Sequence, residues 1–287
     1  MAGRGQRPRA TIAHMSVDLD SYFARIGYQG PRTPELATLR GIISAHTSSI
    51  PFENWGPLLG QPVLLDLPSL EAKLVHARRG GYCFEQNALL QDVLSQLGFG
   101  VQGLSARVLW RQPPDAQTAR SHMLLRVEIG SDSYIADVGF GALTLTAPLA
   151  LSLDVTQATP HEPFRLAAHA RGLDMQAQLS DGFVTLYRFT LEPAFPADYE
   201  VGNYYTSRHP KSHFTQRLMM ALAVPGRRYT LVDNLLSEYV GGRAPERTLL
   251  RDAGALARVI REQLKLELPD TPEVSAQLTR LASTPAP

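Results

Sequence analysis

The stretch Arg78-Arg79-Gly80-Gly81-Tyr82-Cys83-Phe84-Glu85-Gln86-Asn87 organises the chain, because it holds the only cysteine in 287 residues. Two glycines suited to a tight turn precede that cysteine, and a helical pattern follows it. Residues 83, 87, 90, 94 and 97 share one stripe, and Gly98 is placed to end the helix. The thiol therefore lies in the first turn of a predicted helix, on its inward face. There the unpaired N–H groups and the helix dipole favour a thiolate.

The composition limits the function classes without choosing among them. The 287 residues are 44% hydrophobic and 19% charged, which is enough for two or three subdomains around sizeable cores. A formal net charge of +1 gives no electrostatic support for a nucleic-acid partner or a membrane-surface role. One cysteine cannot form an intrachain disulfide, so we expect a cytoplasmic protein. A lone buried cysteine is more often an inert small hydrophobe than a nucleophile.

The first residues look like neither a signal peptide nor a membrane anchor. Residues 1–14 contain three arginines and no apolar core, and we interpret them as a disordered extension. No run of about 18 apolar residues predicts a transmembrane helix.

Helices are expected over the first third of the chain. Ser16, Thr33-Pro34 and Ser69 are the predicted starts of three helices, and the cysteine helix is the fourth. Between the second and third helices lies 51–55, a loop too apolar for a plain linker. Its Phe52 and Trp55 either fill a core or line a pocket, and periodicity favours the core.

Beyond residue 100 the hydrophobic period changes toward two. Short strands are predicted at 105–110, 121–129, 134–138, 164–167, 175–179 and 183–190, and they indicate an antiparallel barrel or sandwich. From about residue 205 the pattern is mixed. Strands are expected at 214–222 and 228–232, a helix is expected after Asp252, and a last helix is expected after Thr271-Pro272.

His122 and Asp137 lie on neighbouring strands of one predicted hairpin and on the same sheet face. A two-residue turn at Ile129-Gly130 would place them directly opposite each other. A four-residue loop at 130–133 would stagger them by four residues, roughly 13 Å along the strand. If they meet beside Cys83, they form the nucleophile, base and orienting acid of a catalytic triad. Each of the three residues alone is more often structural.

Five motifs, in this order, resemble those of the bacterial arylamine N-acetyltransferases. They are Pro51-Phe52-Glu53-Asn54, the cysteine stretch, Ser121-His122-Met123-Leu124-Leu125, Asp137-Val138-Gly139-Phe140-Gly141, and Ser207-Arg208-His209-Pro210-Lys211-Ser212-His213-Phe214. The resemblance covers about residues 16–270. It implies an α+β fold with a helical bundle at 15–98, an antiparallel β-barrel at 99–204 and an α/β lid at 205–287. The triad Cys83, His122 and Asp137 is then expected in the cleft between them.

The resemblance also implies an activity. Acetyl-CoA would donate an acetyl group to Cys83, and an arylamine or arylhydrazine would then take it in a ping-pong reaction, with His122 moving protons in both halves. Coenzyme A is expected near the turn of Gly139 and Gly141. The apolar acceptor pocket is expected at Phe52, Val108, Phe140 and Phe214. Trp55 departs from the family pattern, where a smaller aliphatic residue is expected, and is predicted to narrow that pocket.

Other interpretations stay open at this point. A cysteine hydrolase and an amide synthase share the triad chemistry, although the Cys-Gly-Ser/Ala-Cys signature of papain-like proteases is absent. A thiol sensor would need a broken triad. The scattered histidines and single thiol predict no metal site. We expect a monomer or a homodimer.

Overall fold

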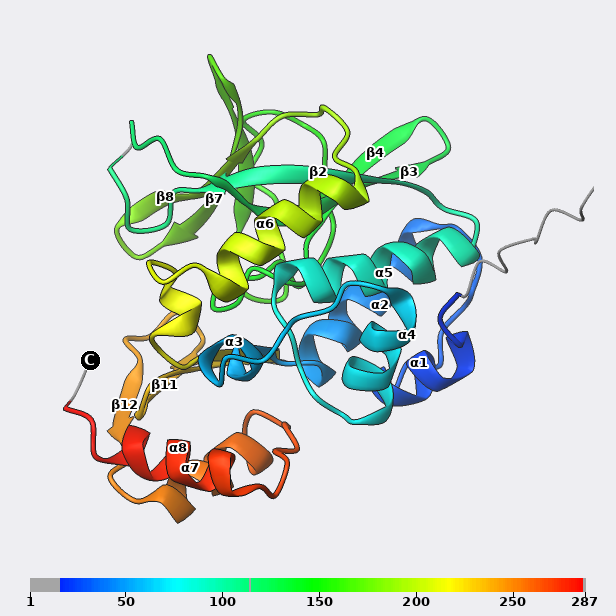
Figure 1. The fold of residues 1–287 in the computed structure, drawn as a ribbon. Helices are drawn as coiled ribbons and strands as arrows, with labels where there is room; N and C mark the ends of the chain where they lie inside the picture. The colour runs from blue at the N-terminus through cyan, green and yellow to red at the C-terminus, as the bar shows by residue number, and fades with distance from the viewer. Residues whose placement is uncertain (1–15, 114, 286–287) are drawn as a thin grey trace, which may run out of the picture.

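The computed structural model describes residues 16–113 and 115–285, so the predicted extension at 1–14 lies outside the described residues. The chain begins with a bundle of helices, at the lower right of Figure 1. Its elements are α1 (Leu19–Ile26), α2 (Leu36–Ser49), α3 (Trp55–Leu58), α4 (Leu67–Leu70), which continues as a π-helical turn (Glu71–His76), and α5 (Cys83–Gln96). The cysteine helix, its buried stripe and its end before Gly98 are as predicted.

The predicted helix starts in this bundle are displaced by two or three residues. The predicted caps are Ser16, Thr33 and Ser69, whereas the observed N-cap residues are Asp18, Glu35 and Asp66. An N-cap oxygen must reach an N–H group two or three residues further along. The Asp18 carboxylate does so at 2.6 Å, and the Asp66 carboxylate accepts from the N–H of Ser69 at 3.0 Å. Each carboxylate therefore takes the role predicted for a nearby hydroxyl.

A seven-stranded antiparallel sheet follows the bundle, at the top of Figure 1. Its strands are β2 (Gly100–Val108), β3 (Arg120–Ile129), β4 (Asp132–Ala136), β5 (Leu149–Ala150), β6 (Phe164–His169), β7 (Gly172–Leu179) and β8 (Gly182–Phe189). They are ordered β5-β4-β3-β2-β8-β7-β6. Bridges from Leu153 to Leu166 and from Gln157 to Phe164 join the segment after β5 to β6. These bridges nearly close the sheet, so the predicted barrel is confirmed.

Strand β3 separates two hydrophobic cores. Met123, Leu125 and Val127 pack against α5 and the rest of the bundle. Leu124 points the other way, into the barrel interior. Because side chains alternate along a strand, His122 belongs to the barrel face of β3, next to the end of α5 that carries Cys83.

The C-terminal part combines a second sheet with two helices. Its elements are β9 (Met219–Val224), β10 (Arg227–Val232), β11 (Leu235–Val240), β12 (Glu246–Leu249), α7 (Ala253–Glu262) and α8 (Pro272–Ala282). Asp252 and Thr271 cap the two helices as predicted. The predicted strand at 214–222 is partly wrong, because His213–Thr215 forms a 3-10 turn and β9 starts only at Met219.

A short N-terminal strand completes this second sheet. β1 (Phe52–Glu53) pairs with β9, in the order β1-β9-β10-β11-β12. Asn54 holds the junction: its amide donates to the carbonyls of Phe214 and Arg217, and its oxygen accepts from the N–H of Met219. Trp55, which was predicted to narrow the acceptor pocket, instead packs into the C-terminal core and is 1% exposed.

Helix α6 (Pro196–Arg208) crosses between the barrel and the bundle and was not predicted (Figure 1). Its Tyr199 lies in the core of the bundle, and Gly202 packs against the ring of Phe84. The proposed division of the chain at residues 99 and 205 stays a prediction. In the part of the chain that the structure describes, no helix is long and apolar enough to cross a membrane.

Candidate active site

Cys83 is the first residue of α5 and is only 4% exposed. Tyr82 is the N-cap, and its backbone N–H donates to the Glu85 carboxylate at 3.1 Å. The Cys83 sulfur lies 3.7 Å from the carbonyl oxygen of Ser121, the residue immediately before His122. The fold therefore brings the predicted nucleophile to the end of β3 that carries the predicted base.

The β3–β4 hairpin has a register between the two considered from the sequence. Ile129 pairs with Asp132, so the turn consists of two residues, Gly130 and Ser131. Pairing ends at Leu125 and Ala136, and Asp137 follows directly after β4. By this register His122 and Asp137 are staggered by two residues, roughly 7 Å along the strand. The chain turns after β4, and the two side chains meet with His122 Nε2 2.7 Å from Asp137 Oδ2.

Asp137 is fully buried and fully hydrogen-bonded. Its second oxygen accepts from the Asn87 amide and from the Gly139 N–H, both at 3.0 Å. Burial alone raises the pKa of Asp137, but the His122 charge and these hydrogen bonds outweigh burial and lower it. Because a carboxylate only accepts hydrogen bonds, His122 Nε2 carries the proton, and Nδ1 is left for the thiol.

The charge on Asp137 also determines the protonation state of His122. Burial lowers the pKa of His122, whereas Asp137 and then Cys83 raise it, and the net pKa lies well above the usual value. The Asp137 charge therefore favours the imidazolium form of His122, which can donate a proton to a group beside it. The arrangement can supply a nucleophile and a proton donor together.

Two residues of the site were not assigned a role from the sequence. The Asn87 amide donates to the Met123 carbonyl as well as to Asp137, and its oxygen accepts from the Val138 N–H, so it ties α5 to the hairpin. Helical spacing, which places Asn87 one turn after Cys83, could have indicated this role. Tyr187 of β8 packs against the His122 ring with centroids 4.7 Å apart. No sequence pattern distinguishes it from a barrel residue.

The four predicted acceptor-pocket residues form two groups, one next to Tyr82 and one next to His122 and Tyr187. The Phe52 and Phe214 rings lie 6.0 Å apart, and Phe214 also contacts Tyr82, next to the nucleophile. The Phe140 ring lies 5.2 Å from His122, and Val108 pairs across the barrel strands with Tyr187. Their role in acceptor binding stays a prediction.

The two glycines predicted to bind coenzyme A have tight packing environments. A Cβ on Gly139 would lie 2.5 Å from the Cα of Cys83, and its N–H is already used by Asp137. Gly141 has a left-handed φ of 93°, and a Cβ there would meet the Phe52 ring at 3.3 Å. Gly139 therefore sets the distance between the hairpin and α5.

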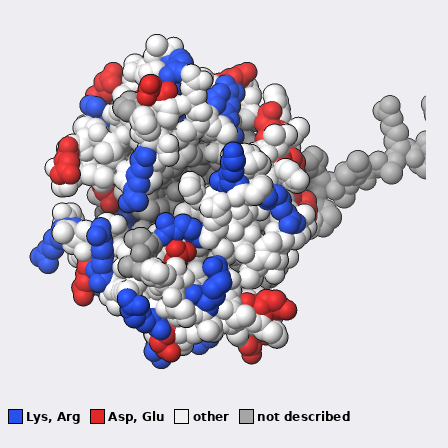
Figure 2. Space-filling view, turned by 60° about the vertical axis from the view of Figure 1, so that its left-hand side comes forward, with Lys and Arg blue, Asp and Glu red and all other residues white. Residues whose placement is uncertain are grey.

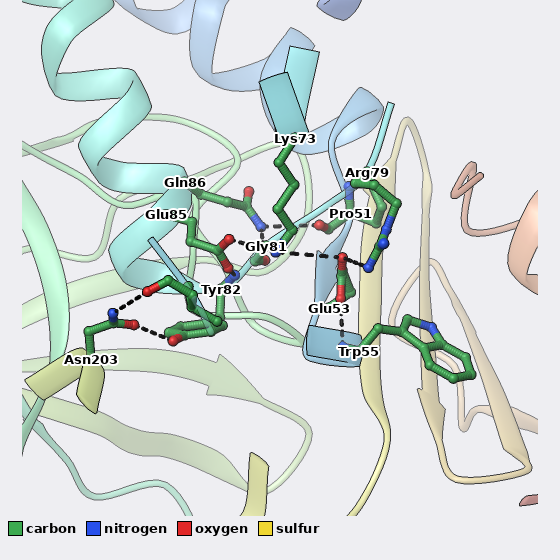
Figure 3. A network of polar contacts seen from close by, with 11 residues as sticks. Pro51, Glu53, Trp55, Lys73, Arg79, Gly81, Tyr82, Glu85, Gln86 and Asn203 are labelled. Carbon is green, nitrogen blue, oxygen red and sulfur yellow. Dashed lines mark hydrogen bonds and ion pairs between the residues drawn. The ribbon is translucent and has the colours of Figure 1, made fainter. Parts of the chain in front are cut away.

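A cluster of four buried or half-buried charges, which we call the ion quartet, lies around the cysteine turn, the segment 79–82 that leads into α5 (Figure 3). It consists of Glu53, Lys73, Arg79 and Glu85. The Lys73 ammonium contacts Glu85 at 2.6 Å and Glu53 at 3.9 Å, and Arg79 contacts Glu53 at 2.7 Å. The side chains of Glu53 and Glu85 are 0% and 1% exposed, and those of Lys73 and Arg79 are 24% and 13% exposed.

The ion quartet holds both ends of the cysteine turn. Arg79 begins the turn. At its end, the Glu85 carboxylate, from the first turn of α5, accepts a hydrogen bond from the backbone N–H of Tyr82. The Gln86 amide holds the middle of the turn: it donates to the Gly81 carbonyl at 2.6 Å and to the Pro51 carbonyl at 3.2 Å (Figure 3). Glu85 places a buried negative charge beside Cys83 at the N-terminus of α5, and the neighbouring Lys73 charge offsets it.

Three comparisons with known proteins agree on the family. An N-acetyltransferase family model matches residues 35–274. The arylamine N-acetyltransferase of Mycolicibacterium smegmatis is 42% identical over 94% of this chain and all of its own length. That of Escherichia coli K12 is 41% identical over 89% of this chain and 91% of its own length. The solved arylamine N-acetyltransferase of Mycobacterium marinum superposes with a TM-score of 0.88 at 39% identity, covering 92% of this chain and all of that one.

Fold and site thus define an acyltransferase built around a buried cysteine. With family-level identity over nearly the full length, the chain belongs to the arylamine N-acetyltransferase family. The family assignment made from the five motifs is confirmed. Among the described residues, no group of three His, Cys, Asp or Glu side chains is arranged to hold a metal ion.

Replacing Gly139 with alanine tests whether the close approach of the hairpin positions the nucleophile. The added methyl group would push against the Cα of Cys83, so we expect a stability loss of about 1–3 kcal/mol and a large drop in the rate of Cys83 alkylation by iodoacetamide. Gly56→Ala is the control, since its Cβ would meet Val63 at an ordinary 3.7 Å. An unchanged alkylation rate in Gly139→Ala would contradict the positioning role.

Asp137→Asn tests the electrostatic origin of the imidazolium. Without the carboxylate charge, burial lowers the pKa of His122 against the remaining effect of Cys83 alone, so we expect the ring to lose its proton at a lower pH. We expect the alkylation rate of Cys83 at pH 7 to fall at least about tenfold, and its pH profile to move to higher pH. Asp174→Asn removes a buried carboxylate elsewhere in the barrel and should leave the profile unchanged. Identical profiles for wild type and Asp137→Asn would refute the ion pair.

A double-mutant cycle on Lys73 and Glu85 tests the ion quartet. Lys73→Gln leaves Glu85 buried without its nearest cation, and we expect a loss of roughly 3 kcal/mol in urea unfolding. Glu85→Gln added to Lys73→Gln leaves a neutral amide pair, so we expect the double variant to recover at least about 1 kcal/mol. Arg32→Gln breaks an exposed pair with Asp20 and should cost less than about 1 kcal/mol. If the effects of Lys73→Gln alone and Glu85→Gln alone add up to the effect of the double variant, coupling between the two residues is excluded.

Proposed function

We propose that this enzyme transfers an acetyl group from acetyl-CoA to an arylamine or arylhydrazine through an acetyl-cysteine on Cys83. The observation that carries the proposal is the buried His122–Asp137 pair beside the N-terminus of α5, in a chain of this family. The catalytic residues are Cys83, His122 and Asp137.

In the first half-reaction the Cys83 thiolate attacks the carbonyl carbon of the thioester. The bond from that carbon to the coenzyme A sulfur breaks, and the leaving thiolate takes the proton held on His122. The products are acetyl-Cys83, coenzyme A and a neutral imidazole. Asp137 holds the ring through Nε2, so that Nδ1 faces the reacting sulfur atoms.

In the second half-reaction the amine nitrogen attacks the acetyl carbon. His122 takes a proton from that nitrogen, and the bond to the Cys83 sulfur breaks. The thiolate–imidazolium pair is restored with the amide as product. General acid–base help of this kind is worth about 10²–10⁴-fold in rate.

The surroundings of the triad suit both substrates. We infer that the aromatic ring of the acceptor binds between the Phe52–Phe214 pair and Phe140, since Phe214 contacts Tyr82, the neighbour of Cys83, and Phe140 contacts His122. A solved structure of the Mycobacterium marinum relative, 38% identical, is a complex with CoA. Figure 2 shows one face of the molecule hollowed near its centre with Lys and Arg side chains around the hollow, an arrangement that favours an anionic donor.

The same acetyl-cysteine could also serve an oxygen acceptor. The Salmonella typhimurium relative, 37% identical, carries the name arylamine N-acetyltransferase / N-hydroxyarylamine O-acetyltransferase. We further infer that the enzyme works in the cytoplasm, where a lone cysteine stays reduced, and that foreign arylamines are among its acceptors.

Intact-protein mass after mixing with acetyl-CoA and no amine tests the proposal. We expect a gain of one acetyl group that is absent in Cys83→Ala and is discharged when an arylamine or arylhydrazine is added. Ser95→Ala changes an exposed residue of the same helix and should acetylate as the wild type does. An adduct that only water discharges would support a hydrolase instead, and an adduct in Cys83→Ala would refute the nucleophile.

A further inference from the structure

Three arginines lie in direct cross-strand register on the barrel, an arrangement that repulsion between like charges makes unfavourable. Arg107 of β2 pairs with Arg120 of β3 on one side and with Arg188 of β8 on the other. Asp174 of β7 continues the row next to Arg188. Like charges directly opposite each other destabilise a sheet. The packing of the fold gives no reason for this row.

Carboxylates within the protein offset only part of this charge. Arg188 is neutralised by Asp174 through two contacts of 2.5 and 2.9 Å. Arg120 has a single exposed contact of 3.4 Å to Glu192, and Arg107 donates to the Thr118 carbonyl, which carries no charge.

A fourth arginine, Arg171, joins the row from the turn between β6 and β7. The ion pairs of the described chain include no carboxylate partner for Arg107 or Arg171. Two positive charges are therefore left without a counter-ion.

All four arginines line one cavity of about 440 Å³, and no acidic side chain lines it. Ser105 and Thr190 add hydroxyl groups. The volume falls within the range of small-molecule sites and is too large for a bare phosphate ion alone. Guanidinium groups bind phosphate oxygens in pairs, which makes clustered arginines typical of phosphate recognition.

This cavity is separate from the triad. Leu104 and Ala106 point into the barrel core, so Ser105 and Arg107, which alternate with them, lie on the outer face of β2. Arg188 lies likewise between the inward Tyr187 and Phe189. His122 is on the barrel side of β3, and a register shift between Ala106 and Arg107 interrupts the alternation there and places Arg120 opposite Arg107. None of the arginines is in the proposed catalytic machinery.

We propose that the outer face of the barrel binds the phosphate group of an organic phosphate between Arg107, Arg120, Arg171 and Arg188. The ligand compensates the two uncovered charges and removes the repulsion along the row. The phosphate can belong to the coenzyme A donor or to a separate phosphorylated metabolite, and both present the same dianion.

Binding is tested with inorganic pyrophosphate, at constant ionic strength against sodium chloride. We expect pyrophosphate well above its Kd to raise the melting temperature of the wild type by about 2–4 °C. In Arg107→Gln/Arg171→Gln this rise should disappear. At low salt without pyrophosphate, Arg107→Gln should melt no lower than the wild type, because it relieves repulsion. Arg258→Gln/Arg261→Gln, which removes two exposed charges from α7, should keep the full pyrophosphate effect.

A second titration distinguishes the two sources of phosphate. If Arg107→Gln/Arg171→Gln weakens binding of coenzyme A several-fold but leaves dephospho-coenzyme A unchanged, the 3′-phosphate of the donor occupies the site. If pyrophosphate still binds the wild type at saturating coenzyme A, the site takes a separate phosphate. A wild type that responds to pyrophosphate no more than to chloride, together with an unchanged affinity of the double variant for coenzyme A, overturns the proposal.

Discussion

The ion pair between Lys73 and Glu85 stabilises the N-terminus of α5, where Cys83 lies, and the rest of the candidate site is assembled against that helix end. Glu85 caps the helix that begins at Cys83, and its carboxylate is 1% exposed. Lys73 offsets the charge of this buried carboxylate and joins it to Glu53 and Arg79. Burial raises the pKa of Glu85, whereas Lys73 lowers it, and the net shift is upward. Lys73 is therefore the nearest charge that favours the ionised form of this carboxylate.

The bundle, the barrel and the hairpin meet at this helix terminus. Gly139 brings the hairpin against the backbone of Cys83, and Asn87 binds the hairpin one helical turn later. His122 and Asp137 then form a hydrogen bond, although the strand pairing staggers them by two residues. The triad geometry thus follows from contacts between elements rather than from the strand ladder alone.

Local patterns in the sequence predicted much of this architecture. The glycine turn, the stripe of α5 and the caps Asp252 and Thr271 depend on neighbours a few residues away, and they were found correctly. The hairpin register stayed open because it depends on where the turn forms. Helix α6 was missed because its buried Tyr199 and Gly202 alternate with exposed Val201 and Tyr204, which leaves no apolar stripe. The family motifs singled out Cys83, His122 and Asp137, and their role as a triad stays a prediction. The contact of Tyr187 with His122 and the row of arginines depend on long-range pairing, which no local pattern records.

The pairing of β1 with β9 bears on how the protein is made. Asn54 hydrogen-bonds to the carbonyl of Phe214, 160 residues away, and Phe52 pairs with Ala221 in the strand that follows. Contacts so distant along the chain close late, because the loop between them must first be ordered. While the chain leaves the ribosome, Cys83 emerges long before Phe214, whose ring contacts Phe52 and Tyr82 beside it. The nascent protein therefore carries the Cys83 thiol without the contacts of Phe214 until the second sheet has been synthesised.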